Sequence, residues 1–506
     1  MAGHPFRQII SSYLDIALLA VAIGCGALLL ASCSREAADA PVAENVAVPA
    51  PAEARWSELY GGTSADQFRD VAMDLQGNSV LVGGSASSTY PTTPGTAQPV
   101  HSPGAGSPGI LNMDVIVTKV DPSGRTLWST FLGGNGYDRA YAVEVDHLGF
   151  ILVAGRAGAG FPTTPGTLQP TFGGGPGAAP YGPEDGFVCK LTSAGQKVWC
   201  TYFGKDELNI IRDIDVDPVG NIYLATSTQR DDWPASWFAN RFQTKRKGGC
   251  DDMLVKLSSD GTRVLWATYI GSSKDETRTV SVRTSSTATW FLTATDGVDL
   301  PTTSGRRPAG GTDFWVGGFS LDGRQLLHSS YVGGTGPEGI ETHNLAVDGD
   351  RVYIAGQTGS STFPNTSTAS FWSGQLDGIV VALDTTARVI FSRYIGTPGA
   401  DGLEGVQASP ADVCVTGFMS GRLPGIPLWG TGGGRDAAMV CLSRNATVLT
   451  HGITVGGTGD DYARSLARTS MSIVGAGHSG SINWPLLSGG VPYGGGGDGS
   501  ALRMQY

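Results

Sequence analysis

The chain has few charged residues and none of the short motifs that mark common catalytic centres. Only 16% of its 506 residues are Asp, Glu, Lys or Arg, against about 25% in an average soluble protein. It contains no G-x-S-x-G nucleophile turn, no H-E-x-x-H metal motif and no G-K-[ST] phosphate loop. Its net charge of −11 disfavours nucleic acid, because phosphates require a dense basic surface. We therefore expect no nucleic-acid partner, and the sequence offers no catalytic residue, cofactor site or metal site.

Glycine, by contrast, is abundant. It supplies 75 of the 506 residues, about twice its usual share of about 7%. Glycine weakens helix interiors and favours tight turns. The composition therefore predicts an all-β fold of many short strands joined by glycine turns.

The N-terminal segment has the pattern of an export signal. An apolar run, IALLAVAIGCGALLL, extends from Ile16 to Leu30 behind Arg7. It is short for a membrane span and has the length of a signal-peptide core. The run ends in Leu-Ala-Ser-Cys, which resembles the lipobox of bacterial lipoproteins. That resemblance implies a signal peptide over residues 1–32 and a lipid on the thiol of Cys33; the alternative is a plain secretory signal in which Cys33 is incidental.

A linker follows the signal. Residues 33–53 are rich in Ala, Pro and Glu and have no apolar periodicity. Such a segment is semi-extended and reaches up to about 60 Å at about 3.1 Å per residue. We expect it to be a tether between the anchor and a folded domain.

The rest of the chain resembles itself at a fixed period. WSELYGG, which begins at Trp56, has six further copies. They begin at Trp128, Trp199, Trp266, His328, Phe391 and His451, 60 to 72 residues apart. Self-similarity of this kind is the mark of a repeat architecture, so we predict seven units.

Each unit has the pattern of four short strands. In the second unit, β-branched and aromatic residues gather in residues 140–146, 150–155, 185–191 and 198–203, with turn residues between these segments. Four-stranded units repeated around an axis form a β-propeller. The predicted fold is a seven-bladed β-propeller over residues 54–506.

The repeat also resembles a known family. The W-S-T-[YF]-[LIV]-G-G start, the D-x-x-G-N turn, the F-P-T-T-P-G loop at Phe161 and the D-x-[FV]-V-x-K-[LV] strand are similar to the bacterial seven-bladed β-propeller repeats called SBBP repeats. The similarity covers Trp56 to the C-terminus and weakens after the third unit. It implies an exported, often surface-attached protein and no particular chemistry.

The two ends of the repeat predict how the ring closes. DGSALRMQY, residues 498–506, matches only a third strand, while residues 56–60 supply an isolated fourth strand. We expect the two to pair and complete the seventh blade, because an unpaired strand edge invites aggregation. The blades are then expected to begin at Asp66, Asp138, Asn209, Asp275, Glu338, Asp401 and Asp460.

Two recurring features have structural interpretations. A bulky residue precedes a proline once per unit, as in Tyr90-Pro91; proline ends a strand, and we expect the bulky side chain to pack between blades. An aspartate opens each third strand, as at Asp114 and Asp185. The clustered oxygens that calcium requires are missing, so we expect these carboxylates to accept hydrogen bonds from nearby backbone N–H groups.

The second-to-third loops are long and variable, which nominates one propeller face for recognition. The most distinctive is the third unit's loop, residues 230–249. Its candidate ligand-binding residues combine aromatic and basic side chains, which often carry binding energy: Trp233, Trp237, Phe238, Arg241, Lys245, Arg246 and Lys247. They would suit an anionic glycan or a protein. The alternative is that Trp233 fills the gap between blades, as Tyr90 and Phe161 do, and that the basic run is merely solvated.

The cysteines fit an oxidising compartment. A two-residue loop would place Cys189 and Cys200 opposite each other, where they can form a cross-strand disulfide; a one-residue bulge would instead leave free buried thiols. Cys414 and Cys441 form a weaker candidate pair, and Cys250 is left over.

A turn followed by tryptophan, DPSGRTLW at residues 121–128, has partial copies as TSAGQKVW and SSDGTRVLW. These resemble the motif of pyrroloquinoline-quinone propellers and of their cofactor-free relatives in outer-membrane assembly. Seven blades and the lack of an adjacent cysteine pair depart from the quinone enzymes, so this interpretation stays a minor alternative.

The sequence as a whole favours a binding or scaffold module. We expect a monomer that is exported and lipid-anchored at the cell envelope, at the outer membrane or cell surface, with a protein or glycan ligand. The alternative is a glycan-active hydrolase or lyase, whose polar residues would converge at the axial mouth of the long-loop face, since propeller active sites assemble from distant blades.

Overall fold

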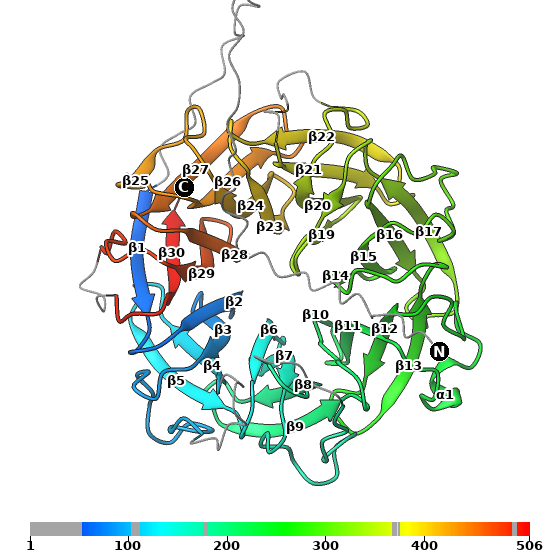
Figure 1. Cartoon of the computed structure of the whole chain (residues 1–506), viewed down its shortest axis with the longest axis horizontal. Helices are drawn as coiled ribbons and strands as arrows, with labels where there is room; N and C mark the ends of the chain where they lie inside the picture. The colour runs from blue at the N-terminus through cyan, green and yellow to red at the C-terminus, as the bar shows by residue number, and fades with distance from the viewer. Residues whose placement is uncertain are drawn as a thin grey trace, which may run out of the picture. The chain divides into compact units, whose positions relative to one another are not determined.

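The computed structural model describes residues 53–102, 112–175, 181–366, 372, 375–487 and 493–505. They form seven sheets around a common axis, antiparallel apart from the short β25 of blade six (Figure 1). The prediction of an all-β, seven-bladed β-propeller is confirmed. The predicted signal peptide, Cys33 and almost all of the tether lie outside the described residues, and no helix in the described ranges is long and apolar enough to cross a bilayer.

Four blades follow one another in simple order. Blade one contains β2 (Asp66–Met73), β3 (Ser79–Ser85), β4 (Asp114–Val120) and β5 (Thr126–Leu132). Blade two contains β6 (Arg139–Val145), β7 (Ile151–Ala157), β8 (Asp185–Leu191) and β9 (Lys197–Phe203). Blade three contains β10 (Asp213–Val216), β11 (Ile222–Thr228), β12 (Asp251–Leu257) and β13 (Val264–Ile270), with the short α1 (Ala235–Phe238) in its long loop. Blade four contains β14 (Val280–Thr284), β15 (Thr289–Thr295), β16 (Asp313–Phe319) and β17 (Leu326–Val332).

The other three blades carry additions or a break in the chain. Blade five contains β18 (Glu338–Gly339), β19 (Leu345–Asp348), β20 (Arg351–Thr358), β21 (Asp377–Asp384) and β22 (Val389–Ile395). Blade six contains β23 (Gly402–Ala408), β24 (Asp412–Met419), β26 (Asp436–Ser443) and β27 (Leu449–Gly456), with β25 (Leu428–Gly430) parallel to β27. Blade seven contains β28 (Asp461–Arg468), β29 (Ser472–Ser479), β30 (Asp498–Gln505) and β1 (Glu53–Tyr60).

The ring is closed by its two ends, as the sequence predicted. The N-terminal strand β1 pairs antiparallel with β30, from Glu53 opposite Gln505 to Tyr60 opposite Gly499. In Figure 1 the blue β1 and the red β30 lie side by side in one blade. The side chain of Trp56 is completely buried in this strand, so closure also contributes to the core.

The two faces of the propeller differ in loop length. The tight-turn face carries the first-to-second and third-to-fourth connections of each blade, such as residues 74–78 and 121–125. The long-loop face carries the second-to-third connections, such as residues 229–250, and the connections between blades. The innermost strand of each blade therefore begins at the long-loop face and ends at the tight-turn face.

The first strand begins later than predicted in five blades, by one residue in β6, β23 and β28 and by four and five residues in β10 and β14. β10 and β14 begin at Asp213 and Val280, later than predicted, because the residues just before them stay outside the regular ladder. In every blade a polar side chain accepts a hydrogen bond from the backbone N–H four residues earlier. We call it the capping residue, and in blades four and seven it is Glu276 and Asp461 instead of the neighbouring Asp275 and Asp460.

Aromatic residues hold neighbouring blades together. The bulky residues that precede proline are all buried, as predicted: Tyr90, Phe161, Trp233, Leu300, Phe363, Leu423 and Trp484. In addition, the tryptophan of one blade's outermost strand packs on a turn glycine of the next blade. A Cβ atom added to that glycine would lie within 3 Å of the indole ring in four pairs, which are Trp56–Gly124, Trp128–Gly195, Trp199–Gly261 and Trp266–Gly323.

The aspartates that open the third strands have the predicted structural role. Asp114 accepts a hydrogen bond from the backbone N–H of Ser102 at 2.6 Å, and Asp185 accepts one from Gly173 at the same distance. The equivalent bonds in other blades end on Asp251, Asp313, Asp436 and Asp498. These carboxylates fix the ends of the long loops.

Candidate functional site

Side chains on the innermost strands converge at the propeller axis, because four of these strands contain a β-bulge. The pairing register skips one residue in each of β2, β6, β23 and β28. The skipped residues are Arg69, Tyr141, Glu404 and Arg464. A bulge re-aims the side chain of its extra residue, and in each case that residue is polar and lies near the long-loop end of the axis.

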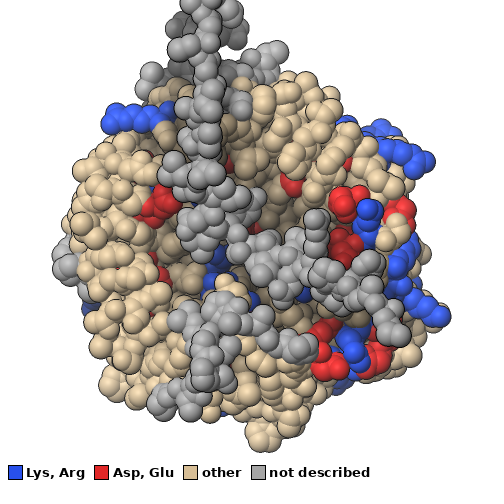
Figure 2. All heavy atoms as spheres, in the orientation of Figure 1, with Lys and Arg blue, Asp and Glu red and all other residues tan. Residues whose placement is uncertain are grey.

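Five arginines form a cluster there. Arg69 and Arg464 come from bulges, Arg139 opens β6, Arg156 lies on β7, and Arg212 directly precedes β10. We call these five residues the axial arginine cluster. Figure 2 shows basic side chains at the centre of the ring.

Three carboxylates pair with three of the five guanidinium groups. Arg69 Nη2 lies 3.0 Å from Glu341 Oε2, and Arg156 Nη1 lies 3.1 Å from Glu184 Oε2.

Arg464 Nη1 contacts both carboxylate oxygens of Glu404, at 2.5 and 2.6 Å. The Arg156–Glu184 pair is almost completely buried, whereas the side chain of Glu341 is 30% exposed. Solvent therefore reaches the carboxylate of Glu341.

The remaining two arginines have no carboxylate partner among the described residues. Arg139 Nη2 donates a hydrogen bond to the hydroxyl oxygen of Tyr141, and the Arg212 guanidinium contacts the Tyr141 ring, with Cζ 4.8 Å from the ring centroid. The guanidinium carbons of Arg69, Arg139 and Arg156 lie 5.4, 4.6 and 5.6 Å from the same centroid. Tyr141 is thus surrounded by four cations.

This charge distribution shifts the protonation of the neighbouring groups. Burial raises the pKa of Tyr141, but the charges of Arg139, Arg156, Arg212 and Arg69 outweigh it and lower the pKa to about 7.

Burial also raises the pKa of the Glu341 carboxyl group, but the charges of the surrounding arginines outweigh it, and the pKa is lowered. Burial, together with Arg464, Arg69 and Arg139, lowers the pKa of His478 well below its usual value, so that histidine is neutral at pH 7. The shifts of Tyr141 and Glu341 report a strongly positive environment, whereas burial is the largest cause of the shift of His478.

His343 lies beneath the axial arginine cluster, on the side toward the tight-turn face. His343 Nε2 lies 2.9 Å from the backbone oxygen of Tyr141 and 3.5 Å from Asp70 Oδ1, and its Nδ1 lies 3.4 Å from Asp213 Oδ1. Burial lowers the pKa of His343, but the two carboxylates outweigh it and the pKa is raised. The side chain of Ser465 donates to Asp70 at 2.5 Å. This layer connects several blades across the axis.

A cavity of about 160 Å³ lies near the tight-turn face, on the side of His343 away from the arginines. Its polar lining comes mainly from Asp70, Glu144, Arg283, Gln407 and Arg468. Acidic and basic side chains are mixed there, so the positive character is confined to the long-loop end of the axis.

The loop predicted to bind ligand, residues 230–249, uses its aromatic side chains in packing. Trp233 is buried and stacks on Phe203, with ring centroids 5.1 Å apart, and Trp237 lies 5.7 Å from Trp233. Phe238 stacks on Tyr269 at 4.4 Å. Among the described residues, the cation that contacts Trp233 is Lys205, from outside the loop.

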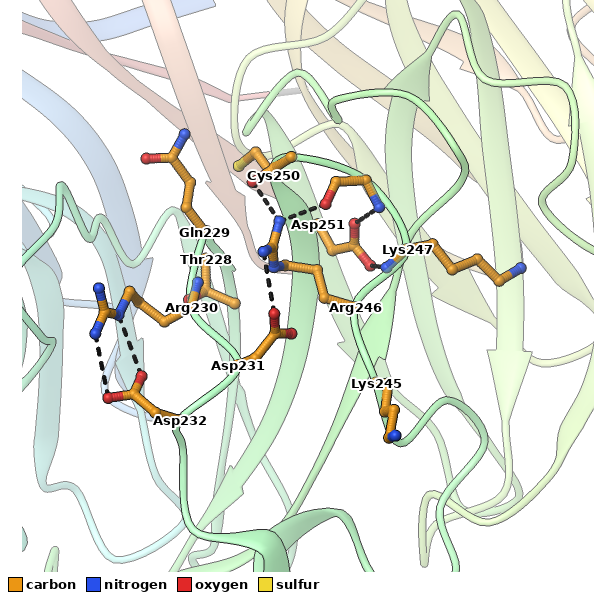
Figure 3. Close-up of polar contacts among 12 residues, drawn as sticks. Thr228, Gln229, Arg230, Asp231, Asp232, Lys245, Arg246, Lys247, Cys250 and Asp251 are labelled. Atoms are coloured by element: carbon orange, nitrogen blue, oxygen red, sulfur yellow. Dashed lines mark hydrogen bonds and ion pairs between the residues drawn. The ribbon is translucent and has the colours of Figure 1, made fainter.

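The basic residues of that loop are arranged separately (Figure 3). The guanidinium group of Arg246 bonds to the carbonyl oxygens of Gly248 and Gly249 and pairs with Asp231 at 3.1 Å. Lys245 and Lys247 are exposed and Arg241 is half-buried. The structure therefore ties Arg246 into the loop fold and leaves the two lysines accessible, and ligand binding by this loop stays a prediction.

Both candidate cysteine pairs are bonded in the structure. Cys189 and Cys200 lie directly opposite each other on β8 and β9, as do Cys414 and Cys441 on β24 and β26. A bulge does occur in blade two, but it falls between the cysteines and the turn and so leaves them in register. Cys250 is free and buried.

Comparisons with known proteins give only weak structural similarities. No family model and no curated protein matches the sequence. Among solved structures, a quinohemoprotein alcohol dehydrogenase from Pseudomonas putida aligns with a TM-score of 0.40 and 9% identity over 92% of this chain and 78% of that one. A protein of unknown function from Dyadobacter fermentans aligns with a TM-score of 0.39 and 11% identity, over 90% of this chain and 99% of that one. An acylaminoacyl peptidase from Pyrococcus horikoshii aligns with a TM-score of 0.39 and 11% identity over 85% of this chain. The alignment spans about half (52%) of the peptidase.

The sequence analysis missed the axial cluster, although the repeat contains a signal for it. The third residue after each capping residue is Arg69, Tyr141, Arg212, Thr279, Glu341, Glu404 and Arg464. Six of the seven are Arg, Glu or Tyr at one position of a β repeat. Aligning the units on the capping residue would have exposed this column.

Proposed function

We propose that the protein is an exported, lipid-anchored β-propeller of the SBBP type that binds an anionic ligand at the axial end of its long-loop face. The observation that carries the proposal is the excess of positive charge at the axis. Five guanidinium groups face three carboxylates, so two positive charges lack a protein counter-charge among the described residues. Buried charge of one sign is costly unless it is paired, and an anionic ligand would supply the missing charge.

The position of the cluster also supports a binding role. The long loops surround this end of the axis, and loops on a rigid scaffold are where recognition residues concentrate. The cluster is built on strands, so its arginines are held before a ligand arrives, and Arg suits bidentate recognition of carboxylate, phosphate or sulfate.

The proposed anchor is supported by features of the opposite face. Glu53, where the N-terminal segment joins the propeller, pairs with Gln505, which in turn pairs with Ser472 beside a tight turn. On the same tight-turn face, exposed apolar side chains occupy turns of four consecutive blades: Met471, Leu75, Leu148 and Val219, which are 63 to 88% exposed. An anchor at Cys33 and these side chains would place the tight-turn face toward the membrane and the arginines away from it.

Binding of the purified protein to an array of neutral, carboxylated, sulfated and phosphorylated glycans tests the binding role. We expect binding to anionic glycans, at least about tenfold weaker in Arg212→Gln, because a charge-assisted hydrogen bond contributes about 1.5–3 kcal/mol. Trp237→Ala and Lys245→Ala are the matched controls for the blade-three loop. Binding lost in these controls but kept in Arg212→Gln would move the site to that loop.

Metabolic labelling with palmitate tests the anchor. The wild-type protein should be labelled and Cys33→Ser should not. Unchanged labelling of Cys33→Ser would show the anchor assignment to be wrong.

A second candidate function is a glycan-active enzyme at the same place. The observation that favours it is the position of Tyr141 among four guanidinium groups. These charges lower the pKa of its hydroxyl to about 7, and a group with a pKa near the working pH is suited to proton transfer. Arginines beside it would neutralise the carboxylate of an acidic sugar, as a lyase requires. Release of unsaturated or reducing products from a bound anionic glycan would favour the enzyme; binding without product would favour the module.

A further inference from the structure

The axial arginine cluster has the charge for a particular class of ligand group. Arg69, Arg156 and Arg464 are paired with carboxylates, whereas Arg139 and Arg212 have no carboxylate partner among the described residues. The net excess is therefore two positive charges, which one dianionic group would balance. A compact tetrahedral oxyanion also offers several oxygens to guanidinium groups that approach from different strands.

Tyr141 lies at the centre of the excess charge. Its ring centroid has four guanidinium carbons within 5.6 Å, and the hydroxyl oxygen accepts a hydrogen bond from Arg139. The groups that face it come from all the neighbouring elements, and they are Arg69 on β2, Tyr137 and Arg139 at the start of β6, Arg156 on β7, Arg212 before β10 and His343 below. The charges that act most strongly on the hydroxyl are the four positive ones of Arg139, Arg156, Arg212 and Arg69, while the carboxylates of Glu341 and Glu184 contact Arg69 and Arg156.

We propose that the axial arginine cluster binds a compact dianionic group, such as sulfate or a phosphate monoester, and that Tyr141 takes up one proton from solvent when this group binds. The inference rests on the proposed function and names the ligand chemistry of the same site. Before an anion binds, the Tyr141 phenolate would supply part of the missing negative charge. A bound dianion takes over the same guanidinium groups, so the phenolate loses its stabilisation and becomes a phenol.

The sign of the pH dependence follows directly. The surrounding guanidinium groups lower the pKa of Tyr141 to about 7, and this pKa should return toward the usual value of about 10 when a dianion binds to them. Between these values, binding should take up close to one proton per ligand. Below about pH 6 the phenol is already protonated, and binding should take up almost none.

Sulfate is a suitable probe, because it stays a dianion over this pH range. The purified protein would be titrated with sodium sulfate in a calorimeter at pH 8 and pH 5.5, at constant ionic strength, in two buffers of different ionisation enthalpy. We expect uptake approaching one proton at pH 8, near zero at pH 5.5, and a parallel loss of one tyrosinate's absorbance near 295 nm. Methyl phosphate in place of sulfate distinguishes a phosphate-ester preference from a general dianion site.

Four variants assign the effect. Tyr141→Phe should keep sulfate binding at pH 8 and lose both the proton uptake and the absorbance change. Arg212→Gln and Arg139→Gln should each weaken sulfate binding about tenfold or more. Tyr223→Phe, a buried tyrosine bonded to Lys256 on blade three, should change neither signal and controls for general effects of tyrosine substitution.

The contrary results are distinct. If sulfate and methyl phosphate do not bind, or bind equally well to both arginine variants, the dianion site is wrong; the proposed function survives only if the glycan array still shows binding that depends on Arg212. If sulfate binds without proton uptake, or if Tyr141→Phe retains the uptake, the role of Tyr141 is wrong. Folding of each variant is checked by its thermal midpoint, and Tyr141→Phe removes only one oxygen.

Discussion

Replacing Gly195 with alanine tests how the blades are held together. Gly195 lies in the turn between β8 and β9 with a φ of +77°, and a Cβ added there would lie 2.7 Å from Trp128 Cε3 of the preceding blade. Carbon atoms in ordinary contact are about 3.5–4.0 Å apart, so the ring or the turn must move by about 1 Å. Trp128 is anchored to the same turn, because its Nε1 donates to the backbone oxygen of Ser193 at 3.0 Å.

The expected magnitude has two parts. Alanine in a left-handed conformation costs about 1–2 kcal/mol, and overpacking a well-filled contact costs about 1–3 kcal/mol more. The sum is about 2–5 kcal/mol. Gly149 lies in another turn of the same blade with a φ of +81°, and an added Cβ there would meet nothing within 4 Å. Alanine at Gly149 therefore has the backbone cost alone, and the difference between the two variants gives the cost of overpacking. Gly149→Ala should therefore cost only about 1–2 kcal/mol.

The assay is denaturant unfolding of both variants, followed by circular dichroism and tryptophan fluorescence. We expect the midpoint of Gly195→Ala to fall clearly below that of Gly149→Ala. Blades five and six carry alanine at the corresponding turn position, Ala387 and Ala446, where the preceding blade has His328 and Phe391 in place of tryptophan. Trp128→Phe should accordingly offset part of the cost of Gly195→Ala. Equal midpoints for the two glycine variants would refute the tryptophan–turn contact as a rigid joint.

Three further predictions follow from the axis, the disulfides and the closing strand. His343→Gln should lower the free energy of unfolding by about 3 kcal/mol at pH 6. Because the pKa of His343 is raised in the folded state, its contribution is fully present below about pH 6.5 and is lost as the pH rises through the folded pKa. A stability difference between wild type and variant that widens toward pH 9 would contradict this prediction. Replacing Cys189 and Cys200 with alanine should cost about 3 kcal/mol, and the same change at Cys414 and Cys441 should add to it, since the pairs lie in different blades; thermal midpoints of the three variants check this. Deleting residues 1–60 should give an aggregating protein, whereas deleting residues 1–52 should leave the thermal midpoint unchanged, which light scattering and calorimetry distinguish.

Much of the fold could be predicted because the repeat is visible in the sequence. The recurring start of each unit, from Trp56 to His451, predicted the number of blades. The lone fourth strand at one end of the repeat and the missing fourth strand at the other predicted the β1–β30 pairing. Blade boundaries were less certain in blades three and four, because Asn209 and Glu276 cap the blade while the residues after them stay outside the regular ladder. The repeat pattern alone does not show where pairing resumes.

The candidate site was predictable only in part. The axial mouth of the long-loop face was foreseen as one location for a site, but its residues were not. Arg69 and Arg464 are far apart in sequence and reach the axis through bulges, and a bulge depends on strand pairing that a single repeat does not reveal. Trp233 shows the converse: an aromatic next to basic residues looks like a binding surface in sequence, yet the gap between blades two and three needs an aromatic ring for packing.

The closing strand also determines how the protein bears mechanical load. β1 runs from Glu53 at the tight-turn face to Tyr60 at the long-loop face. A pull on the N-terminal segment, directed away from the tight-turn face, acts along the strand. The hydrogen bonds to β30 are then stressed together in shear instead of opening one after another, and the indole of Trp56, wedged against Gly124, must be dragged past the neighbouring blade. The strand that completes the ring is thus placed to resist being drawn out of it.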